Sequence, residues 1–230
     1  MSTGIGNDGR IGRFGWKAQN PSLLIFSGEA YNVEMGITSE AFPIERDETT
    51  SCQFATVLND VTPSVNKIPA IVNFANFQRF LAPPTPVSNF GTVSENSIRR
   101  GRYQFTNVGC ALCHTPQLQT GHATVAALRG KPVNLFSDLA VHQMGPGLAD
   151  DILQGEAQGD EFRTSPLWGL GQRIFFLHDG RTDDLLEAIQ AHKSAGNSKF
   201  GPSEANGVIH NFNQLSERHK QDVLNFLRSL

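Results

Sequence analysis

The sequence predicts a mainly α fold with long irregular connections, and three observations predict it. The C-terminal segment repeats apolar residues at helical spacing, with Val223, Phe226 and Leu227 on one face. Strand signals are few and short, and stretches rich in proline and glycine separate the helical segments. The chain has 230 residues, 39% of them hydrophobic, which is enough for a sizeable core.

Residues 1–86 are expected to form a first unit. A helix is predicted through 22–31, a polar and acidic stretch follows at 39–50, and the run 68–81 is apolar enough at helical spacing to be a buried helix. Three of the four residues 83–86 are prolines, which cannot continue a helix. We therefore expect a linker there between two compact units.

Residues 87–230 are expected to form the second unit. A helix is predicted through 94–108, and it delivers the chain to Cys110. A further helix is expected over 184–195, and Ser216 is a suitable N-cap for the C-terminal helix.

The charge balance argues against several classes of partner. Lys and Arg number 19 against 22 Asp and Glu, a net charge of -3, with no long run of one sign. Nucleic acid and anionic membranes are therefore not expected as partners. No stretch approaches the roughly 18 apolar residues of a membrane span, and residues 1–13 are polar and Gly-rich, unlike an export signal. The chain as given is predicted to be soluble.

The segment Cys110-Ala111-Leu112-Cys113-His114 matches the attachment pattern of haem c. Two thiols three positions apart on a helical turn can each form a thioether with a vinyl group of one porphyrin, and the following imidazole then reaches the iron. The sequence therefore predicts one covalently bound haem c, with His114 as an iron ligand. The remaining cysteine, Cys52, has no evident partner and is expected to be a buried or idle thiol.

Two other interpretations of the two cysteines are weaker. A thioredoxin-like dithiol would need a preceding strand and a βαβ frame, whereas a helical pattern and Gly109 precede Cys110. A zinc site would need two further Cys or His ligands at suitable spacing. His122 is near, but there is no second cysteine pair.

The sixth iron ligand has two candidates. Leu185, Ile189 and His192 follow the i, i+4, i+7 spacing, so His192 is predicted on the apolar face of its helix, where an imidazole needs a partner. Met144, in the turn-rich segment 142–147, is the alternative. A thioether would raise the potential and a second imidazole would lower it. A buried His192 satisfied by a backbone carbonyl is the third possibility, and spacing alone leaves all three open.

Aromatic and basic residues further along the chain are candidates to surround a porphyrin. The aromatic candidates to pack against the porphyrin are Trp168, Phe175 and Phe176. The basic candidates to pair with its propionates are Arg163, Arg173 and Arg181. An ordinary core with surface arginines explains any one of them equally well.

With these residues in place, the chain resembles the C-terminal part of a di-haem cytochrome c peroxidase-like protein. That group of di-haem oxidoreductases is related to bacterial di-haem peroxidases and to the enzyme that matures tryptophan tryptophylquinone. The resemblance rests on the haem motif, then 162–171, then 176–181, then 186–189 with His192. It implies a cytochrome c-like haem domain over 87–230, and it implies His192 as sixth ligand, because the peroxidases have a ligand, usually methionine, at that place.

The resemblance extends more weakly upstream. Residues 12–18 and 32–38 resemble the latter part of a first haem domain, in which a carboxylate beside the peroxidatic iron assists proton movement. The resemblance implies that Glu34 is this catalytic carboxylate and that Trp16 lies on the electron route. Without it, Glu34 is a solvated acid and Trp16 an ordinary aromatic residue.

One departure from the family pattern is that a second haem motif is missing, because Cys52, Cys110 and Cys113 are the only cysteines. We expect either a fragment lacking the first haem domain and its export signal, or a natural single-haem form, and we favour the fragment. Residues 1–86 would then be the remainder of the first domain, and the full-length protein would bind a second haem.

The resemblance implies haem c-dependent electron transfer in a periplasmic oxidoreductase that reduces hydrogen peroxide. A small redox protein or a quinone-linked donor would supply the electrons. The alternative is a simple electron-carrier cytochrome c without peroxidase activity. A further alternative is a chain that never acquires haem, because attachment takes place in the periplasm and no signal is present.

Overall fold

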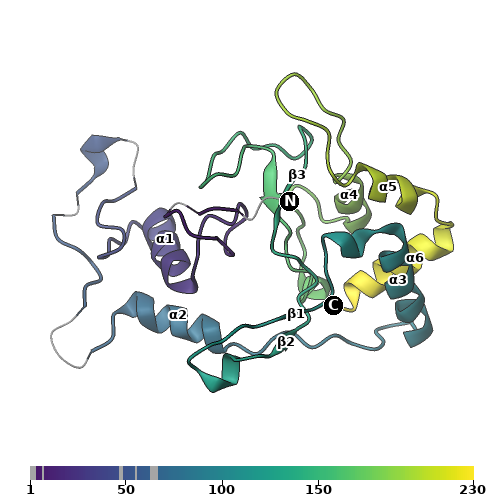
Figure 1. The fold of residues 1–230 in the computed structure, drawn as a ribbon, viewed down its shortest axis with the longest axis horizontal. Helices are drawn as coiled ribbons and strands as arrows, with labels where there is room; N and C mark the ends of the chain where they lie inside the picture. The colour runs from purple at the N-terminus through teal and green to yellow at the C-terminus, as the bar shows by residue number, and fades with distance from the viewer. Residues whose placement is uncertain (1–3, 7, 47–48, 55, 63–66) are drawn as a thin grey trace.

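The computed structural model describes residues 4–6, 8–46, 49–54, 56–62 and 67–230. Within these ranges the α-helices are α1 (Leu23–Met35), α2 (Ala70–Phe80), α3 (Glu95–Val108), α4 (Leu185–Gln190), α5 (Asn206–Asn213) and α6 (Glu217–Arg228). Single 3-10 turns are η1 (Thr50–Cys52), η2 (Cys110–Leu112), η3 (Ala126–Leu128) and η4 (Leu170–Gln172). Figure 1 shows α1 and α2 on one side, α3 to α6 on the other, and long irregular segments between them.

The strands are two or three residues long and form two small antiparallel pairs. β1 (Leu118–Gln119) pairs with β2 (Pro132–Val133), and β3 (Val141–Gln143) pairs with β4 (Glu161–Arg163). In the second pair His142 lies opposite Phe162. The described residues thus agree with the expected scarcity of strands and with the expected long connections.

α1 and α2 both lie in residues 1–86, the expected first unit, and pack against each other. Ser22 caps α1 by accepting a hydrogen bond from the Ile25 amide, and Gly36, at φ 67, ends it. The helix predicted over 22–31 therefore exists and continues for one more turn.

The helix predicted over 68–81 is α2, but its burial was overestimated. Ile71 and Ala75 are its buried residues, whereas Phe77 and Phe80 are 60% and 58% exposed. The expectation of a buried helix is wrong for this outer face, because α1 covers only one side of α2. After Phe80 the proline-rich segment has no regular structure, as predicted.

Within residues 87–230, the main packing of helices is the crossing of α3 and α6. Both helices begin after serine caps, Ser216 as predicted and Ser94 at the start of the helix predicted over 94–108. At the crossing, a Cβ on Gly101 would lie 1.9 Å from the Asp222 carbonyl oxygen, so glycine allows the two backbones to approach closely. The core that they share is formed mainly by Phe105, Phe136, Leu170, Phe176, Phe212, Val223, Phe226, Leu227 and Leu230.

Two helices differ from expectation. α4 begins after its cap Asp184, as predicted, but it ends at Gln190, so His192 lies in a turn beyond the helix. α5 was not predicted, because its sequence is short and mixes polar with apolar residues. Its buried residues are Ile209 and Phe212.

A buried carboxylate joins α3 to α6 and gives the first prediction. Asp222 accepts hydrogen bonds from Arg100 Nε at 2.8 Å, from Arg100 Nη2 at 2.9 Å and from Ser97 Oγ at 2.5 Å. Burial raises the pKa of Asp222, but the hydrogen bonds from Arg100 and Ser97 outweigh burial, and the pKa lies below its usual value.

We expect Asp222→Asn to lower the free energy of unfolding by about 2 kcal/mol at pH 7, because charged hydrogen bonds are lost. The pKa is lowered in the folded state, so the stabilisation is present above pH ~4 and is lost as the pH falls through the folded pKa. The difference between variant and wild type should therefore shrink in acid. Guanidinium unfolding at pH 7 and at low pH measures this difference in the free energy of unfolding. The control is Glu217→Gln, which changes an exposed carboxylate. A difference independent of pH would contradict this account.

Candidate functional site

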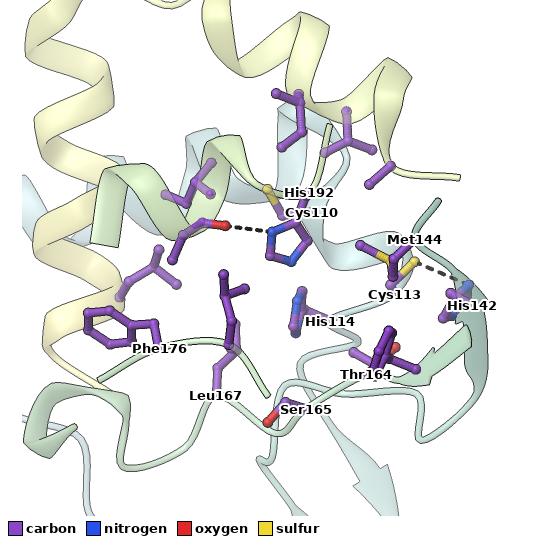
Figure 2. Close-up of a pocket in the computed structure, with 18 of the residues that line it drawn as sticks. Cys110, Cys113, His114, His142, Met144, Thr164, Ser165, Leu167, Phe176 and His192 are labelled. Atoms are coloured by element: carbon purple, nitrogen blue, oxygen red, sulfur yellow. Dashed lines mark hydrogen bonds between the residues drawn. The ribbon is translucent and has the colours of Figure 1, made fainter. Parts of the chain in front are cut away.

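A cavity of about 390 Å³ lies beside the α3–α6 core, and Figure 2 shows part of its wall. This volume is in the range of small-molecule and cofactor sites. Cys110, Cys113 and His114 all line it. Further lining side chains come from distant segments and include Trp16, Phe105, His142, Met144, Phe162, Arg163, Leu167, Arg173, Phe176, His178, His192 and Phe212.

The cysteine motif enters the cavity through a sharp turn. α3 ends at Gly109, whose φ of 105 suits glycine, and η2 begins at once with Cys110. The His114 amide then donates to the Cys110 carbonyl at 2.9 Å, which closes a compact turn. Both sulfurs and the imidazole therefore reach one cavity from a single turn. Burial raises the pKa of Cys110 to about 12, so its free thiol stays uncharged.

His114 and His192 face each other in this cavity (Figure 2). His114 Nδ1 donates to the Phe136 carbonyl at 3.1 Å, and His192 Nδ1 donates to the Ala188 carbonyl at 2.8 Å. Burial lowers the pKa of His114 to about 4 and also lowers the pKa of His192. Both rings are therefore neutral near pH 7, and each keeps its Nε2 lone pair available for a metal.

The spacing of these rings suits one metal ion between them. Their centres are 6.5 Å apart. A bond from a metal to an imidazole nitrogen is about 2.0–2.1 Å, and that nitrogen lies about 1.1 Å from its ring centre, so rings on opposite sides of a metal have centres about 6.3 Å apart. The donor set therefore fits an iron porphyrin. The carbonyl partner of His192, which was weighed as an alternative to ligation, occupies only the other ring nitrogen.

The carbonyl that orients His114 belongs to a strained residue. Phe136 is buried and has φ 54, a left-handed conformation that costs a residue with a side chain about 1–2 kcal/mol. This conformation occurs at the residue whose oxygen accepts the His114 proton. Backbone strain of this kind is concentrated at functional sites.

Two arginines line the cavity. Arg163 donates to the Gly15 and Thr164 carbonyls, and no carboxylate in the described parts of the chain forms an ion pair with it. Burial, and then the nearby charge of Arg173, lowers the pKa of Arg163 to about 10. A half-buried guanidinium beside a second cation fits an anionic group such as a porphyrin propionate.

Of the other residues proposed as porphyrin contacts, Arg181, Phe175 and Trp168 do not line the cavity. Arg181 is bonded to Asp179 and to the Gly147 carbonyl, outside the cavity lining. Phe176 is buried in the cavity wall, but Phe175 is 65% exposed, and Trp168 is not a lining residue. Of the three aromatic candidates, the structure therefore brings only Phe176 to the site.

The N-terminal segment supplies part of the wall. Trp16 lines the cavity and meets His178 edge to face, with ring centres 6.3 Å apart. Lys17, 2% exposed, places Nζ 3.1 Å from an Asp150 carboxylate oxygen and 3.9 Å from the centre of the Phe162 ring. The same ammonium group donates to three backbone carbonyls, those of Gln158, Gly159 and Glu161.

His142 is a functional candidate that the sequence did not single out. Its Nε2 lies 3.0 Å from Asp138 Oδ2, its Nδ1 lies 2.9 Å from Glu204 Oε2, and the Cys113 sulfur is 3.8 Å from Nδ1. Hydrogen bonding to Cys113, and then to Glu204 and Asp138, raises the pKa of His142 to about 10. Both ring nitrogens face carboxylates, so the ring is a buried cation. The four-residue spacing of Asp138 and His142 was visible in the sequence, but the contact with Glu204 was not.

The remaining predicted residues lie apart from the cavity. Glu34 is exposed on α1. Cys52 is exposed in η1, as fits an idle thiol, and His122 is exposed. Met144 lines the cavity and is one of the side chains drawn in Figure 2.

The two rival interpretations of the cysteines receive little support. All three cysteines lie in the described part of the chain and all are free thiols. A helix, and not the strand of a βαβ frame, precedes the motif. Cys113, Asp138 and His142 do offer ligand atoms within 4.8 Å of one another, but this set differs from the zinc set considered with His122.

Facing neutral imidazoles across an apolar cavity, with two thiols in its wall, define a haem-binding redox protein. Comparison with protein families identifies which one: the family described as "Di-haem oxidoreductase, putative peroxidase" matches residues 2–230. The chain therefore belongs to the di-haem oxidoreductase family, whose cofactor is haem.

Two other comparisons add little. The chain is similar to a solved structure of hydrazine synthase from Kuenenia stuttgartiensis, "Pressurized with 20 bar Xenon", with 18% identity and a TM-score of 0.45. That match covers 70% of this chain and 55% of the other, so this chain spans about half the length of its neighbour. No curated protein matches the chain.

In the described ranges, none of the helices combines the length and apolarity needed to cross a bilayer.

Lys17 gives a prediction about the cavity wall. We expect Lys17→Met to lower the free energy of unfolding by about 3 kcal/mol, because Asp150 and three carbonyls lose a buried charged donor. The matched control is Lys199→Met, because the ion pair of Lys199 with Asp151 is exposed. Its loss should change the free energy of unfolding by less than about 0.5 kcal/mol. Guanidinium unfolding measures both variants. Equal effects would show that the burial of Lys17 has no energetic importance.

Proposed function

We propose that this chain binds one haem c through thioethers at Cys110 and Cys113, with His114 and His192 as axial ligands, and transfers electrons within a peroxide-reducing di-haem oxidoreductase. The observation that supports this most is the 6.5 Å separation of the two ring centres, each ring having its Nδ1 bonded to a carbonyl. Family membership supports the haem-based redox chemistry.

The choice of His192 over Met144 is supported by orientation. His192 has one nitrogen bonded to the Ala188 carbonyl, which fixes the ring with its other nitrogen toward His114 (Figure 2). The pairing of two imidazoles lowers the potential relative to a thioether. Two protein ligands also leave no open position, which suits transfer of electrons and not binding of peroxide.

The residues of the wall have distinct proposed roles. The bound haem supplies one-electron transfer. Arg163 and Arg173 compensate the propionate charges, and Phe176 excludes water from one side of the cavity. Trp16, which lies in the wall and comes from the first unit, is proposed to be on the electron route between the two haem domains.

The whole protein is proposed to reduce hydrogen peroxide at a second haem, held by the domain to which residues 1–86 belong. Glu34 would act there as acid and base, and its exposure on α1 agrees with a role outside the cavity described above. Residues 87–230 would form the cytochrome c-like relay domain. The electron donor would be a small redox protein or a quinone-linked carrier, and haem c attachment implies the periplasm.

A simple electron carrier is the second candidate, and the two-imidazole arrangement also suits it. Peroxide-dependent oxidation of a reduced cytochrome by the full-length, haem-loaded protein tests the choice. Turnover that is lost in Glu34→Gln supports the oxidoreductase, whereas reversible reduction without turnover supports the carrier. Mass spectrometry of periplasmically produced protein first tests attachment, because the bare polypeptide mass would exclude both.

The ligand assignment gives a spectroscopic prediction. His192→Ala should convert the haem from low spin to high spin, because the iron loses one imidazole, while Met144→Ala should leave the low-spin spectrum unchanged. Absorption and magnetic circular dichroism spectra of the two variants and the wild type measure this. The reverse pattern would make Met144 the ligand, and no effect of either change would reject both residues.

A further inference from the structure

We propose that His142, clamped between Asp138 and Glu204, is a positioning residue that keeps the His192 imidazole on the iron opposite His114. We call these three residues the Asp138–His142–Glu204 brace. The inference rests on the proposed function, since it assumes that His114 and His192 are the axial ligands. It concerns how the chain keeps these two imidazoles in position, because neither His114 nor His192 lies within a helix.

The first arm of the brace reaches the cysteine motif. The Asp138 amide donates to the Cys113 carbonyl at 2.8 Å, and the Phe136 carbonyl accepts the proton of His114 Nδ1. Segment 136–138 is therefore bonded directly to the motif turn. Asp138 Oδ2 then accepts from His142 Nε2 at 3.0 Å. Displacement of His142 would consequently act on the segment that orients His114.

The second arm reaches His192. Glu204 accepts from His142 Nδ1 at 2.9 Å and from the Gln143 amide at 3.1 Å, and its own amide donates to the Gln143 carbonyl at 3.0 Å. The preceding residue, Ser203, donates through Oγ to the His192 carbonyl at 2.6 Å. The segment fixed by His142 is thus hydrogen-bonded to the ligand residue itself.

His192 needs this support because it lies outside regular structure. α4 ends at Gln190, and the His192 amide is held only by a turn bond of 3.2 Å to the Ile189 carbonyl. The Ser203 contact and the Ala188 contact of the ring are its other hydrogen bonds in the described structure. The position of the imidazole therefore depends on segment 203–206 as well as on α4.

The charges of the brace explain why His142 is critical. The His142 side chain is 5% exposed, Asp138 is 15% exposed and Glu204 is 41% exposed. The cationic ring separates two carboxylates that repel each other. Without the ring, they face each other across a partly buried space, and the more exposed Glu204 moves outward. This movement takes Ser203 away from His192 and loosens the imidazole.

The experiment measures spin state and carbon monoxide binding on the haem-loaded protein. Wild type, His142→Gln and Glu204→Gln are compared, with Glu217→Gln as matched control, because Glu217 is an exposed carboxylate far from the brace in sequence. Carbon monoxide binds ferrous haem only where a protein ligand has left. We expect both brace variants to bind it about 10–100-fold more tightly than wild type, with a partial high-spin signal, and the control to be unchanged.

The outcomes separate the two proposals. One outcome is that the wild type is low-spin and that both brace variants keep its spectrum and its carbon monoxide affinity. This outcome would overturn the brace and leave the ligand assignment intact. Lower melting temperatures with unchanged affinity would likewise overturn it, since they indicate a merely structural role. A high-spin wild type, or a His192→Ala protein like wild type, would overturn the ligand assignment and the brace with it. If His142→Gln fails to fold, the partly exposed Glu204→Gln decides.

Discussion

The structure depends on one constraint, the fixed distance between two neutral imidazoles that come from different parts of the chain. His114 is positioned by a turn that Gly109 makes possible, and by the strained carbonyl of Phe136. His192 projects from beyond the end of α4. The crossing of α3 and α6 provides the rigid base on which both are mounted, because its core adjoins the cavity.

Buried charges hold the surrounding segments in place. Each of them is costly to remove from water, and each is compensated by several oxygen atoms or by an opposite charge. Lys17 attaches the N-terminal segment to the β4 region, and Asp222 joins α3 to α6. Arg163 differs, because in the described structure its hydrogen bonds go to neutral carbonyls and the charged group near it is the cation Arg173. Its missing counter-charge is the feature of the wall that most directly favours an anionic cofactor.

Features set by neighbouring residues could be predicted from the sequence. The cap Ser216 is predictable because N-cap chemistry is local, and the cysteine motif is predictable because its pattern is contained in five residues. His192 was selected from a helical spacing, although the helix ends before it. Contacts between distant segments could not be predicted. The burial of Lys17, the pairing of His142 with Glu204, and the exposed outer face of α2 all depend on which segments meet.

The Arg163 guanidinium reaches the Gly15 carbonyl, 148 positions earlier in the chain. The pocket is therefore closed by contacts of very long sequence separation, which form late because the intervening chain must first be ordered. The motif turn is closed by the bond between the His114 amide and the Cys110 carbonyl, only four positions apart, so it can form before these contacts. The two thiols are then already held in one turn, in a wall that is still open on the side that His192 later covers. A pocket that closes late in folding thus leaves time for the haem to enter.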